Sequence, residues 1–291
     1  MSRLLITGAS GFLGWNLCQQ LKHQFEIIGT CHQHPMRMHG IFTVPINLAQ
    51  LGDLQHFFED IRPDAVIHTA AYSQPNFCET HRNETDPLNV MVPGRLADLC
   101  AHKKIPLVFT SSDMVFDGNH PPYDEASTVN PINYYGTQKA LAEQKVMAHY
   151  PEAVICRMPL MFGNPGPFAS SFIQPFLQAL KAGKPLDLFV DEYRNPISAR
   201  DAVSGILLAL KSWHGILHLG GQEHLSRYEF VKKMARIFQF PDAILNPCRI
   251  QDVVMPAPRP GDLKMISNKA YKLGFNPGSV ETELEALYQQ L

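Results

Sequence analysis

Two adjacent tyrosines and a lysine stand in the segment INYYGTQK, residues 132–139. An α-helix turns by about 100° per residue, so side chains four residues apart share one face. Tyr135 and Lys139 have this spacing, whereas Tyr134 and Lys139 are five residues apart and point in different directions. A phenol titrates at about 10, and a nearby ammonium favours the phenolate. The pair of Tyr135 and Lys139 could therefore serve acid–base catalysis, with Tyr134 as a packing or substrate-facing neighbour.

A second group of polar residues ends an apolar run in VFTSSDMVFDG, residues 108–118. Ser111, Ser112 and Asp113 fall at the carboxyl end of a strand that we expect near the centre of a sheet, where α/β proteins bind ligands. A hydroxyl at this place could donate a hydrogen bond to a substrate carbonyl. The alternative is that these residues only begin a turn.

Three glycines are spaced G-x-x-G-x-x-G in TGASGFLG, residues 7–14, between a predicted strand and a predicted helix. Gly8 permits a tight turn, Gly11 lets the backbone approach a pyrophosphate at the helix N-terminus, and Gly14 lets the helix pack closely on the sheet. A strand–helix turn without a ligand is the alternative. The position at the first such junction of the chain favours a dinucleotide site.

The segment GTCHQHPMRMHG, residues 29–40, contains no Asp or Glu. NAD-binding folds often place a carboxylate in this region, for the ribose 2′-hydroxyl. His32, His34 and Arg37 instead lie where a 2′-phosphate could be held, which favours NADP, with NAD as the alternative and an uninvolved loop as the competing interpretation. A metal site formed by His32, His34 and His39 is disfavoured, because the usual supporting ligands are not evident.

Apolar, β-branched runs alternate with helical segments over the first half of the chain. The predicted strands are RLLIT (3–7), FEIIGT (25–30), IFTVP (41–45), DAVIHT (64–69), PLVFTSS (106–112) and AVICR (153–157), and the predicted helices cover 12–22, 51–61, 87–102 and 133–149. This alternation predicts an α/β protein with a Rossmann-type, doubly wound parallel sheet. Its ligand crevice would lie at the carboxyl ends of the strands.

The pattern loosens after residue 157. Helices are expected over 171–182, 199–212 and 227–238, the last opened by a capping-box pattern of Ser226 and Glu229, and a strand over 215–220. We therefore expect residues 1–160 to form an NAD(P)-binding domain. Residues 161–291 should form mainly a smaller C-terminal substrate-binding lobe, with about 197–220 packing back on the first domain.

Composition excludes several classes of function. The 291-residue chain has a formal net charge of −2, so nothing predicts binding to nucleic acid or to an anionic membrane. No stretch approaches the roughly 18 apolar residues of a membrane helix, and the short apolar run before Gly8 does not resemble a signal peptide. Six widely spaced cysteines without a C-x-x-C pattern are typical of free thiols in the cytoplasm.

Together these motifs resemble the extended branch of the short-chain dehydrogenase/reductase superfamily. More closely, SSDMVFDG, NYYGTQKALAE, ISARDAV and RPGDL resemble the dTDP-4-dehydrorhamnose reductase group. The resemblance implies NAD(P)H-dependent hydride transfer to a keto group, expected to be that of a nucleotide-linked 4-keto-sugar. It implies that Ser112 binds the substrate carbonyl, that Tyr135 donates the proton, and that Lys139 binds the nicotinamide ribose and lowers the tyrosine pKa.

The same resemblance extends the expected site beyond these three residues. The cofactor would contact Gly8, Ser10, Gly11, Phe12, Leu13, Gly14, His32, Arg37, Asn47, Leu48, Ala70, Ala71, Tyr72, Asn89, Tyr135 and Lys139. The substrate would contact Asp113, Met114, Phe162 and Arg259. The expected partner is a small molecule, a sugar nucleotide, and the protein is expected to form a homodimer.

Three positions depart from the group: Asn47 replaces an Asp, Leu160 a Trp and Leu217 a Tyr. The last two concern the sugar pocket and leave the identity of the sugar open. A sugar-nucleotide dehydratase is disfavoured because Met114, not Glu, follows Asp113, and an epimerase because the ribose carboxylate is missing. A non-catalytic, NADP-binding regulatory subunit like that of methionine adenosyltransferase stays open, since the site residues can be kept for binding alone.

Overall fold

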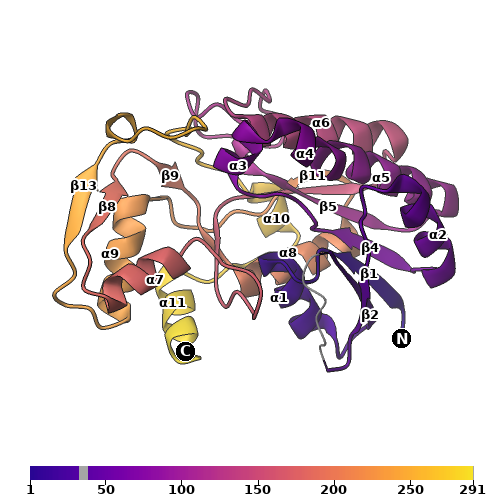
Figure 1. The fold of residues 1–291 in the computed structure, drawn as a ribbon, viewed down its shortest axis with the longest axis horizontal. Coiled ribbons are helices and arrows are strands. Elements are labelled where there is room, and N and C mark those ends of the chain that lie inside the picture. Colours follow the sequence, from indigo (N-terminus) through magenta and orange to yellow (C-terminus); the bar gives the residue numbers. More distant parts are fainter. Residues whose placement is uncertain (33–38, 291) are drawn as a thin grey trace.

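The computed structural model describes residues 1–32 and 39–290 (Figure 1). Its main feature is a seven-stranded parallel sheet in the order β11-β6-β5-β4-β1-β2-β3. The strands are β1 (Arg3–Thr7), β2 (Glu26–Cys31), β3 (Phe42–Pro45), β4 (Ala65–His68), β5 (Leu107–Ser112), β6 (Val154–Met158) and β11 (Gly215–His218). The strand order reverses between β1 and β4, which is where such sheets bind ligands. The predicted Rossmann-type fold is confirmed.

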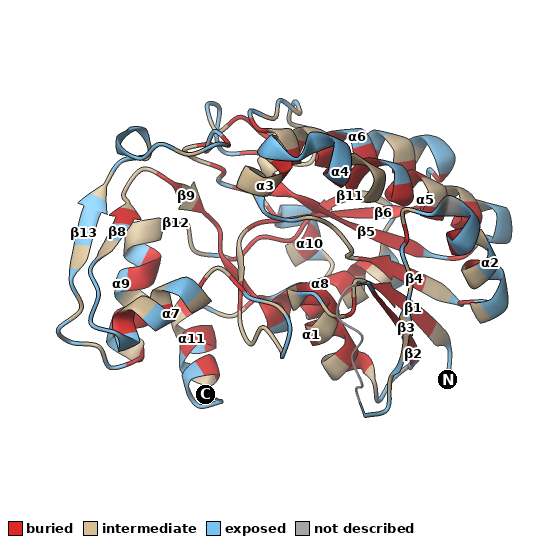
Figure 2. Ribbon diagram, in the orientation of Figure 1, coloured by how far each residue is buried: buried red, intermediate tan, exposed pale blue. Residues whose placement is uncertain are grey.

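Helices cover both faces of this sheet. One face packs against α1 (Phe12–Leu21) and α8 (Ala199–Ser212), and the other against α2 (Leu51–Ile61), α5 (Val92–Lys103) and α6 (Tyr134–His149). Since neither face of the central strands meets water, the strands are continuous apolar runs. Figure 2 shows these strands as the buried middle layer of the domain.

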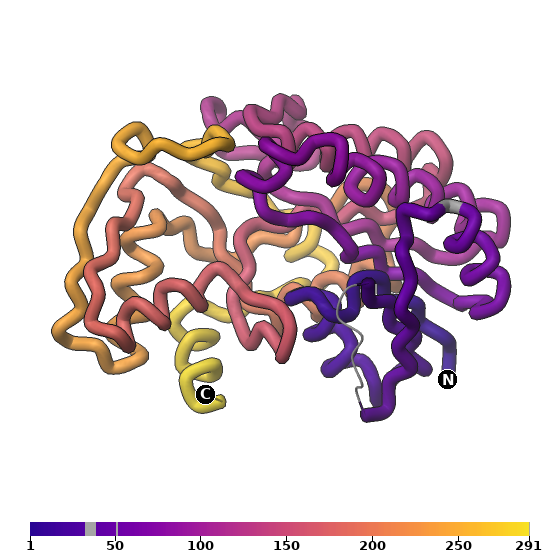
Figure 3. Tube along the Cα trace, viewed as in Figure 1, coloured from indigo at the N-terminus to yellow at the C-terminus, as the bar shows by residue number. Residues whose placement is uncertain are grey.

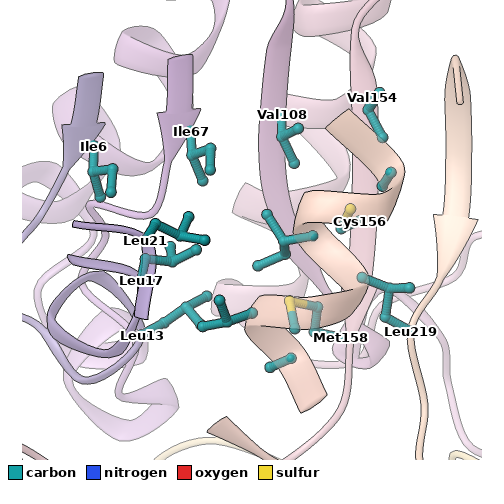
Figure 4. Packing of buried hydrophobic residues seen from close by; sticks show 14 of the residues in the cluster. Ile6, Leu13, Leu17, Leu21, Ile67, Val108, Val154, Cys156, Met158 and Leu219 are labelled. Carbon is teal, nitrogen blue, oxygen red and sulfur yellow. The ribbon is translucent and has the colours of Figure 1, made fainter. Parts of the chain in front are cut away.

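The packing of α1 fixes the position of the turn that precedes it. Leu13, Leu17 and Leu21 are four residues apart and form a column beside the strand residues Ile6 and Ile67 (Figure 4). All five side chains are at least nine-tenths buried. The first turn of α1 is thereby held at the carboxyl end of β1.

A second part of the chain has its own apolar core and stands beside the sheet, in salmon, orange and yellow in Figure 3. It contains α7 (Gln174–Lys181), α9 (Arg227–Ile237), α11 (Val280–Tyr288) and the parallel pair β8 (Leu186–Phe189) and β13 (Leu245–Cys248). We call this part the lobe. The predicted capping box of α9 is confirmed: the hydroxyl of Ser226 accepts the Glu229 N–H at 3.1 Å, and the Glu229 carboxylate accepts the Ser226 N–H at 2.8 Å.

The remaining described elements are short. They are α3 (Pro75–Thr80), α4 (Arg82–Asp86), η1 (Pro87–Met91), η2 (Asp113–Val115), β7 (Met161–Phe162), β9 (Tyr193–Arg194), β10 (Ile197–Ser198), β12 (Leu225–Ser226), η3 (Ile250–Asp252) and α10 (Asn268–Lys272). In the described part of the chain, no helix combines the length and the apolar character needed to cross a membrane.

The helix predicted over 87–102 is interrupted in the structure. Its first turn is the π-helical η1, and regular α-helix begins only at Val92. The physical reason is Pro93, which has no N–H to donate and whose ring clashes with the carbonyl one turn earlier in a regular helix. The wider turn accommodates the proline and carries Asn89, one of the predicted site residues.

Candidate active site

The glycine-rich turn between β1 and α1 is shaped by close backbone contacts. Gly8 has a φ of +72°, which favours glycine, and a Cβ there would lie 2.8 Å from the Cα of Ala70. A Cβ on Gly14 would lie 2.1 Å from the Gly8 carbonyl oxygen. Gly11 is exposed at the start of α1, which no described side chain caps. The first-turn N–H groups and the positive helix end can therefore bind an anion.

The loop after β4 lies against this turn. The hydroxyl oxygen of Thr7 accepts the backbone N–H groups of Thr69 at 3.2 Å and of Ala70 at 3.3 Å. The Thr69 hydroxyl donates to the Thr7 carbonyl at 2.6 Å. Ala70 and Ala71 are partly exposed here and Ala70 lies directly against Gly8, so this predicted cofactor-contacting alanine and glycine are neighbours.

Asn89 connects this loop to the helix that carries the tyrosines. Its side-chain oxygen accepts the Tyr72 N–H and its Nδ2 donates to the Tyr72 carbonyl, both at 2.9 Å. The same Nδ2 donates to Gln138 Oε1 of α6 at 2.8 Å. Since its amide group is fully engaged with the protein, Asn89 holds the backbone of Tyr72 in place.

Lys139 is buried on the face of α6 that packs on β5. Its Nζ donates to the Thr110 carbonyl at 2.9 Å and lies 4.8 Å from the Phe109 ring centroid and 5.8 Å from that of Tyr135. Burial lowers the lysine pKa to about 8, and the Glu143 carboxylate opposes this shift. The ammonium is therefore the form present at neutral pH.

Tyr135 shares this face, as the helical spacing predicts. Its phenol is buried, and burial raises its pKa, with further contributions from Cys78 and Asp113. The expected lowering of this pKa by Lys139 is therefore wrong for this structure: the pKa is raised, because desolvation disfavours the phenolate. A raised pKa keeps the phenol protonated, which is the form that a proton donor needs. Sequence reasoning missed Cys78, which gives no signal at a distance of more than fifty residues.

Tyr134 points to a different network. Its hydroxyl donates to both carboxylate oxygens of Asp86, at 2.8 and 2.9 Å, and its backbone N–H donates to Glu79 at 2.8 Å. The guanidinium of Arg82 lies 4.4 Å above its ring centroid. Its phenol is thus committed to α4 and is not adjacent to the lysine.

Ser112 ends β5 and caps η2. Its Oγ accepts the Met114 N–H at 3.2 Å and donates to Asp113 Oδ1 at 3.0 Å. A Cβ on Gly136 would lie only 2.1 Å from the Met114 carbonyl oxygen, so the first turn of α6 packs directly on η2. This contact brings the Ser112 loop to the turn that carries Tyr135. The glycine after the tyrosine pair was the available signal for this close approach.

A series of buried ion pairs connects Asp113 with charged residues near the lobe. Arg194 Nε lies 3.4 Å from Asp113 Oδ2, Arg194 Nη2 lies 3.3 Å from Glu192 Oε1, and Arg227 Nη2 lies 2.6 Å from Glu192 Oε2. Glu192, Arg194 and Arg227 also line a small pocket with Leu160, Phe172, Pro196, Leu225, Ser226 and Phe230. These charged residues were missed because nothing in the sequence links them to the motif that contains Asp113.

Asp113 provides a test of this arrangement through its pKa. Burial raises that pKa from 3.8 to about 6, although Arg194 and Ser112 oppose the shift. The folded protein therefore favours the protonated carboxyl of Asp113. This proton stabilises the folded state fully below a pH of about 4, and the stabilisation is lost as the pH rises through about 6. Relative to Asp113→Asn, the wild-type free energy of unfolding should fall by about 3 kcal/mol over that interval. Urea unfolding of both proteins at several pH values measures it, and a pH-independent difference would contradict it.

The other predicted cofactor residues occupy varied environments. Ser10 and Phe12 are partly exposed at the glycine-rich turn, whereas Leu13 is buried beneath it. Leu48 is also buried, while Asn47 is exposed and its Oδ1 accepts the N–H of Ala49 at 3.1 Å. His32 is exposed directly after β2, and His34 and Arg37 lie outside the described residues.

The predicted substrate residues other than Asp113 are divided between surface and core. Met114 is partly exposed beside Ser112. Arg259 is partly buried, and its Nη2 donates to Asn76 Oδ1 at 3.1 Å. Phe162 is 1% exposed and packs edge-on against Phe230, 5.2 Å between ring centroids, so it lies in the core of the lobe.

Known proteins resemble this chain over nearly its full length. The methionine adenosyltransferase 2 subunit beta of Xenopus tropicalis is 30% identical over 281 residues, which are 94% of this chain and 83% of that protein. A hypothetical dTDP-4-dehydrorhamnose reductase from Sulfolobus tokodaii is 30% identical, with a TM-score of 0.84 over 96% of this chain and 98% of that one.

A dTDP-4-dehydrorhamnose reductase from Bacillus anthracis, solved in complex with NADP, has a TM-score of 0.89 at 24% identity and covers 100% of both chains. This likeness concerns the fold. The family described as RmlD substrate binding domain matches residues 2–291, which bears out the resemblance found in the motifs. The chain belongs to the RmlD substrate binding domain family.

Proposed function

We propose that this protein is an NAD(P)H-dependent reductase that transfers a hydride to the keto group of a nucleotide-linked 4-keto-sugar. The observation that carries the proposal is the buried phenol of Tyr135 beside Lys139, at the carboxyl end of β5, and burial raises the pKa of that phenol. The family membership and the reductase named among its structural relatives support the same activity.

The residues divide the chemistry among them. NADPH, when bound, supplies the hydride. The glycine-rich turn would hold its pyrophosphate, because Gly11 leaves the N-terminus of α1 uncovered. Ser112 keeps its proton for donation, since its Oγ already accepts the Met114 N–H, and it would turn from Asp113 to the substrate carbonyl. Tyr135 would give the carbonyl oxygen its proton, and the ammonium of Lys139 would stabilise the phenolate left behind.

The lobe would bind the rest of the substrate. Arg194, Arg227 and Arg259 face the two carboxylates of Asp113 and Glu192, which leaves an excess of positive charge in this region. A sugar nucleotide carries phosphates that such a region would attract. In this proposal the lobe of residues 161–291 mainly binds substrate, and residues 1–160 bind the dinucleotide.

An assay of substrates tests the activity. Purified protein with NADPH is incubated with dTDP-, GDP- and UDP-linked 4-keto-sugars, and NADPH oxidation is followed by absorbance. We expect turnover with at least one of them, and we expect Tyr135→Phe to lower that turnover strongly. If protein that binds NADPH oxidises none, the reductase proposal fails.

A second candidate is a non-catalytic, NADP-binding regulatory subunit. The 30% identity to a methionine adenosyltransferase subunit beta favours it. In that case the protein would bind NADP without turning over any keto-sugar and would co-purify in size-exclusion chromatography with a methionine adenosyltransferase catalytic subunit. Turnover of a 4-keto-sugar at an ordinary enzyme rate would decide against it.

We expect tighter binding of NADPH than of NADH. The segment 29–40 contains His32, His34 and Arg37 but no carboxylate, so no negative side chain of this segment would repel a 2′-phosphate, and the arginine and histidines offer hydrogen-bond donors for it. A charge-assisted phosphate contact contributes roughly 1.5–3 kcal/mol, which is about ten- to a hundredfold in affinity. Calorimetric dissociation constants measure the preference. Equal affinities, or tighter NADH binding, would show that these residues do not select the cofactor.

A further inference from the structure

Glu143 makes buried contacts one helical turn beyond those of Lys139. Lys139 and Glu143 are four residues apart on α6, and they are 3% and 5% exposed. The Lys139 Nζ donates to the Thr110 carbonyl at 2.9 Å, and the hydroxyl of Ser111 donates to Glu143 Oε1 at 2.5 Å. Successive turns of the helix are thus attached to successive residues of β5.

Glu143 is itself held from the neighbouring strand. Arg157 of β6 donates from Nε to Glu143 Oε1 at 3.0 Å and from Nη2 to Oε2 at 2.7 Å. Arg157 is paired with Ser111 in the sheet, and its guanidinium lies 5.1 Å from the ring centroid of Phe116. The carboxylate therefore has a fixed position relative to both strands, because such bidentate pairs restrict geometry strongly.

We propose that Glu143 is a positioning residue for Lys139: through its bonds to Ser111 and Arg157 it fixes α6 on β5, so that the ammonium stands beside Tyr135. The same carboxylate opposes the lowering of the Lys139 pKa by burial. The role in the reaction rests on the proposed reductase function, whereas the effect on Lys139 does not. Glu143 is not among the residues expected to contact cofactor or substrate, and its hydrogen bonds are to Ser111 and Arg157.

The groups that face Lys139 support this role. They are His68 from β4, Cys78 from α3, and Tyr135 and Glu143 from α6. Burial lowers the pKa of His68 to about 3 and raises that of Cys78 to about 11, so both are neutral at pH 7. Of these four groups, only Glu143 offers a negative charge. Burial lowers the pKa of Lys139 to about 8, and Glu143 gives the largest opposing effect.

The decisive measurement is the titration of Lys139 itself, followed by NMR of protein labelled at lysine ¹³Cε, with the signal assigned by Lys139→Met. In Glu143→Gln, which keeps the size of the side chain, we expect the acid dissociation constant of Lys139 to rise by at least about tenfold. The matched control is Glu283→Gln, since Glu283 is also 5% exposed and bonded to an arginine, Arg200, but lies on α11. It should leave Lys139 unchanged.

Because Glu143→Gln leaves Arg157 buried without its partner, it can fail to fold. The double variant Glu143→Gln with Arg157→Met removes both charges and is expected to fold, since apolar replacement of a buried pair is often neutral. Loss of the Arg157 charge would by itself raise the Lys139 pKa, so the double variant is compared with Arg157→Met, relative to which it should lower the Lys139 pKa. An unchanged Lys139 titration in whichever folded variant is obtained overturns the proposal, even if the protein proves to have no reductase activity. If turnover is found, its pH profile should shift in Glu143→Gln and not in Glu283→Gln.

Discussion

Replacing Tyr135 by Phe is expected to lower turnover by about 10²–10⁴, the usual contribution of a positioned general acid. The substitution removes one oxygen from a buried ring, for which the structure records no hydrogen bond to a described residue, so folding and NADPH binding should survive. Steady-state rates with the active 4-keto-sugar, together with calorimetry of NADPH binding, separate the lost proton donor from lost structure.

The adjacent tyrosine provides the matched control. Tyr134→Phe removes a hydroxyl bonded to both oxygens of Asp86, which should lower the free energy of unfolding by about 1 kcal/mol while turnover stays close to wild type. Lys139→Met should instead reduce both turnover and NADPH affinity.

If Tyr134→Phe is the inactive variant and Tyr135→Phe is nearly normal, the helix register is wrong. If neither matters in an active enzyme, Asp113 becomes the candidate donor.

The elements around these tyrosines were predictable for physical reasons. The strand over residues 3–7 and the helices over 51–61 and 199–212 have the predicted bounds. Buried parallel strands are recognisable as continuous apolar runs, and amphipathic helices by apolar residues that recur once per helical turn. The assignment of Tyr135 rather than Tyr134 to the lysine's face needs only helical geometry, which is local information.

The lobe was much less predictable. The nearby short strands β7, β9, β10 and β12 contain two residues each, too few for an alternation to be recognised. The contact of Asp113 with Arg194 joins residues that are 81 positions apart, and it depends on how the lobe stands against the sheet. Local sequence patterns carry no information on such pairs. The raised pKa of Tyr135 was missed for the same reason, since burial is set by the whole fold.

The second large effect is expected at the glycine-rich turn, where Gly11→Val should weaken NADPH binding by more than about a hundredfold. Gly11 is exposed, its φ of −78° and ψ of 168° are open to valine, and among the described residues an added Cβ would come near only the Gly8 carbonyl oxygen, at 3.2 Å. The protein should therefore fold. The side chain would stand where a pyrophosphate must approach the first-turn N–H groups of α1.

Gly14 distinguishes a ligand effect from a folding effect. A Cβ there would lie 2.1 Å from the Gly8 carbonyl oxygen, so Gly14→Ala forces the helix away from the turn and should lower the free energy of unfolding by about 1–3 kcal/mol. Thermal unfolding without cofactor should thus separate the two variants, with Gly11→Val near wild type and Gly14→Ala clearly destabilised. Calorimetry showing wild-type NADPH affinity in folded Gly11→Val would exclude this turn as the dinucleotide site. A destabilised Gly11→Val would instead mean that the glycine serves the fold, because its added side chain would then collide with the protein before any ligand is bound.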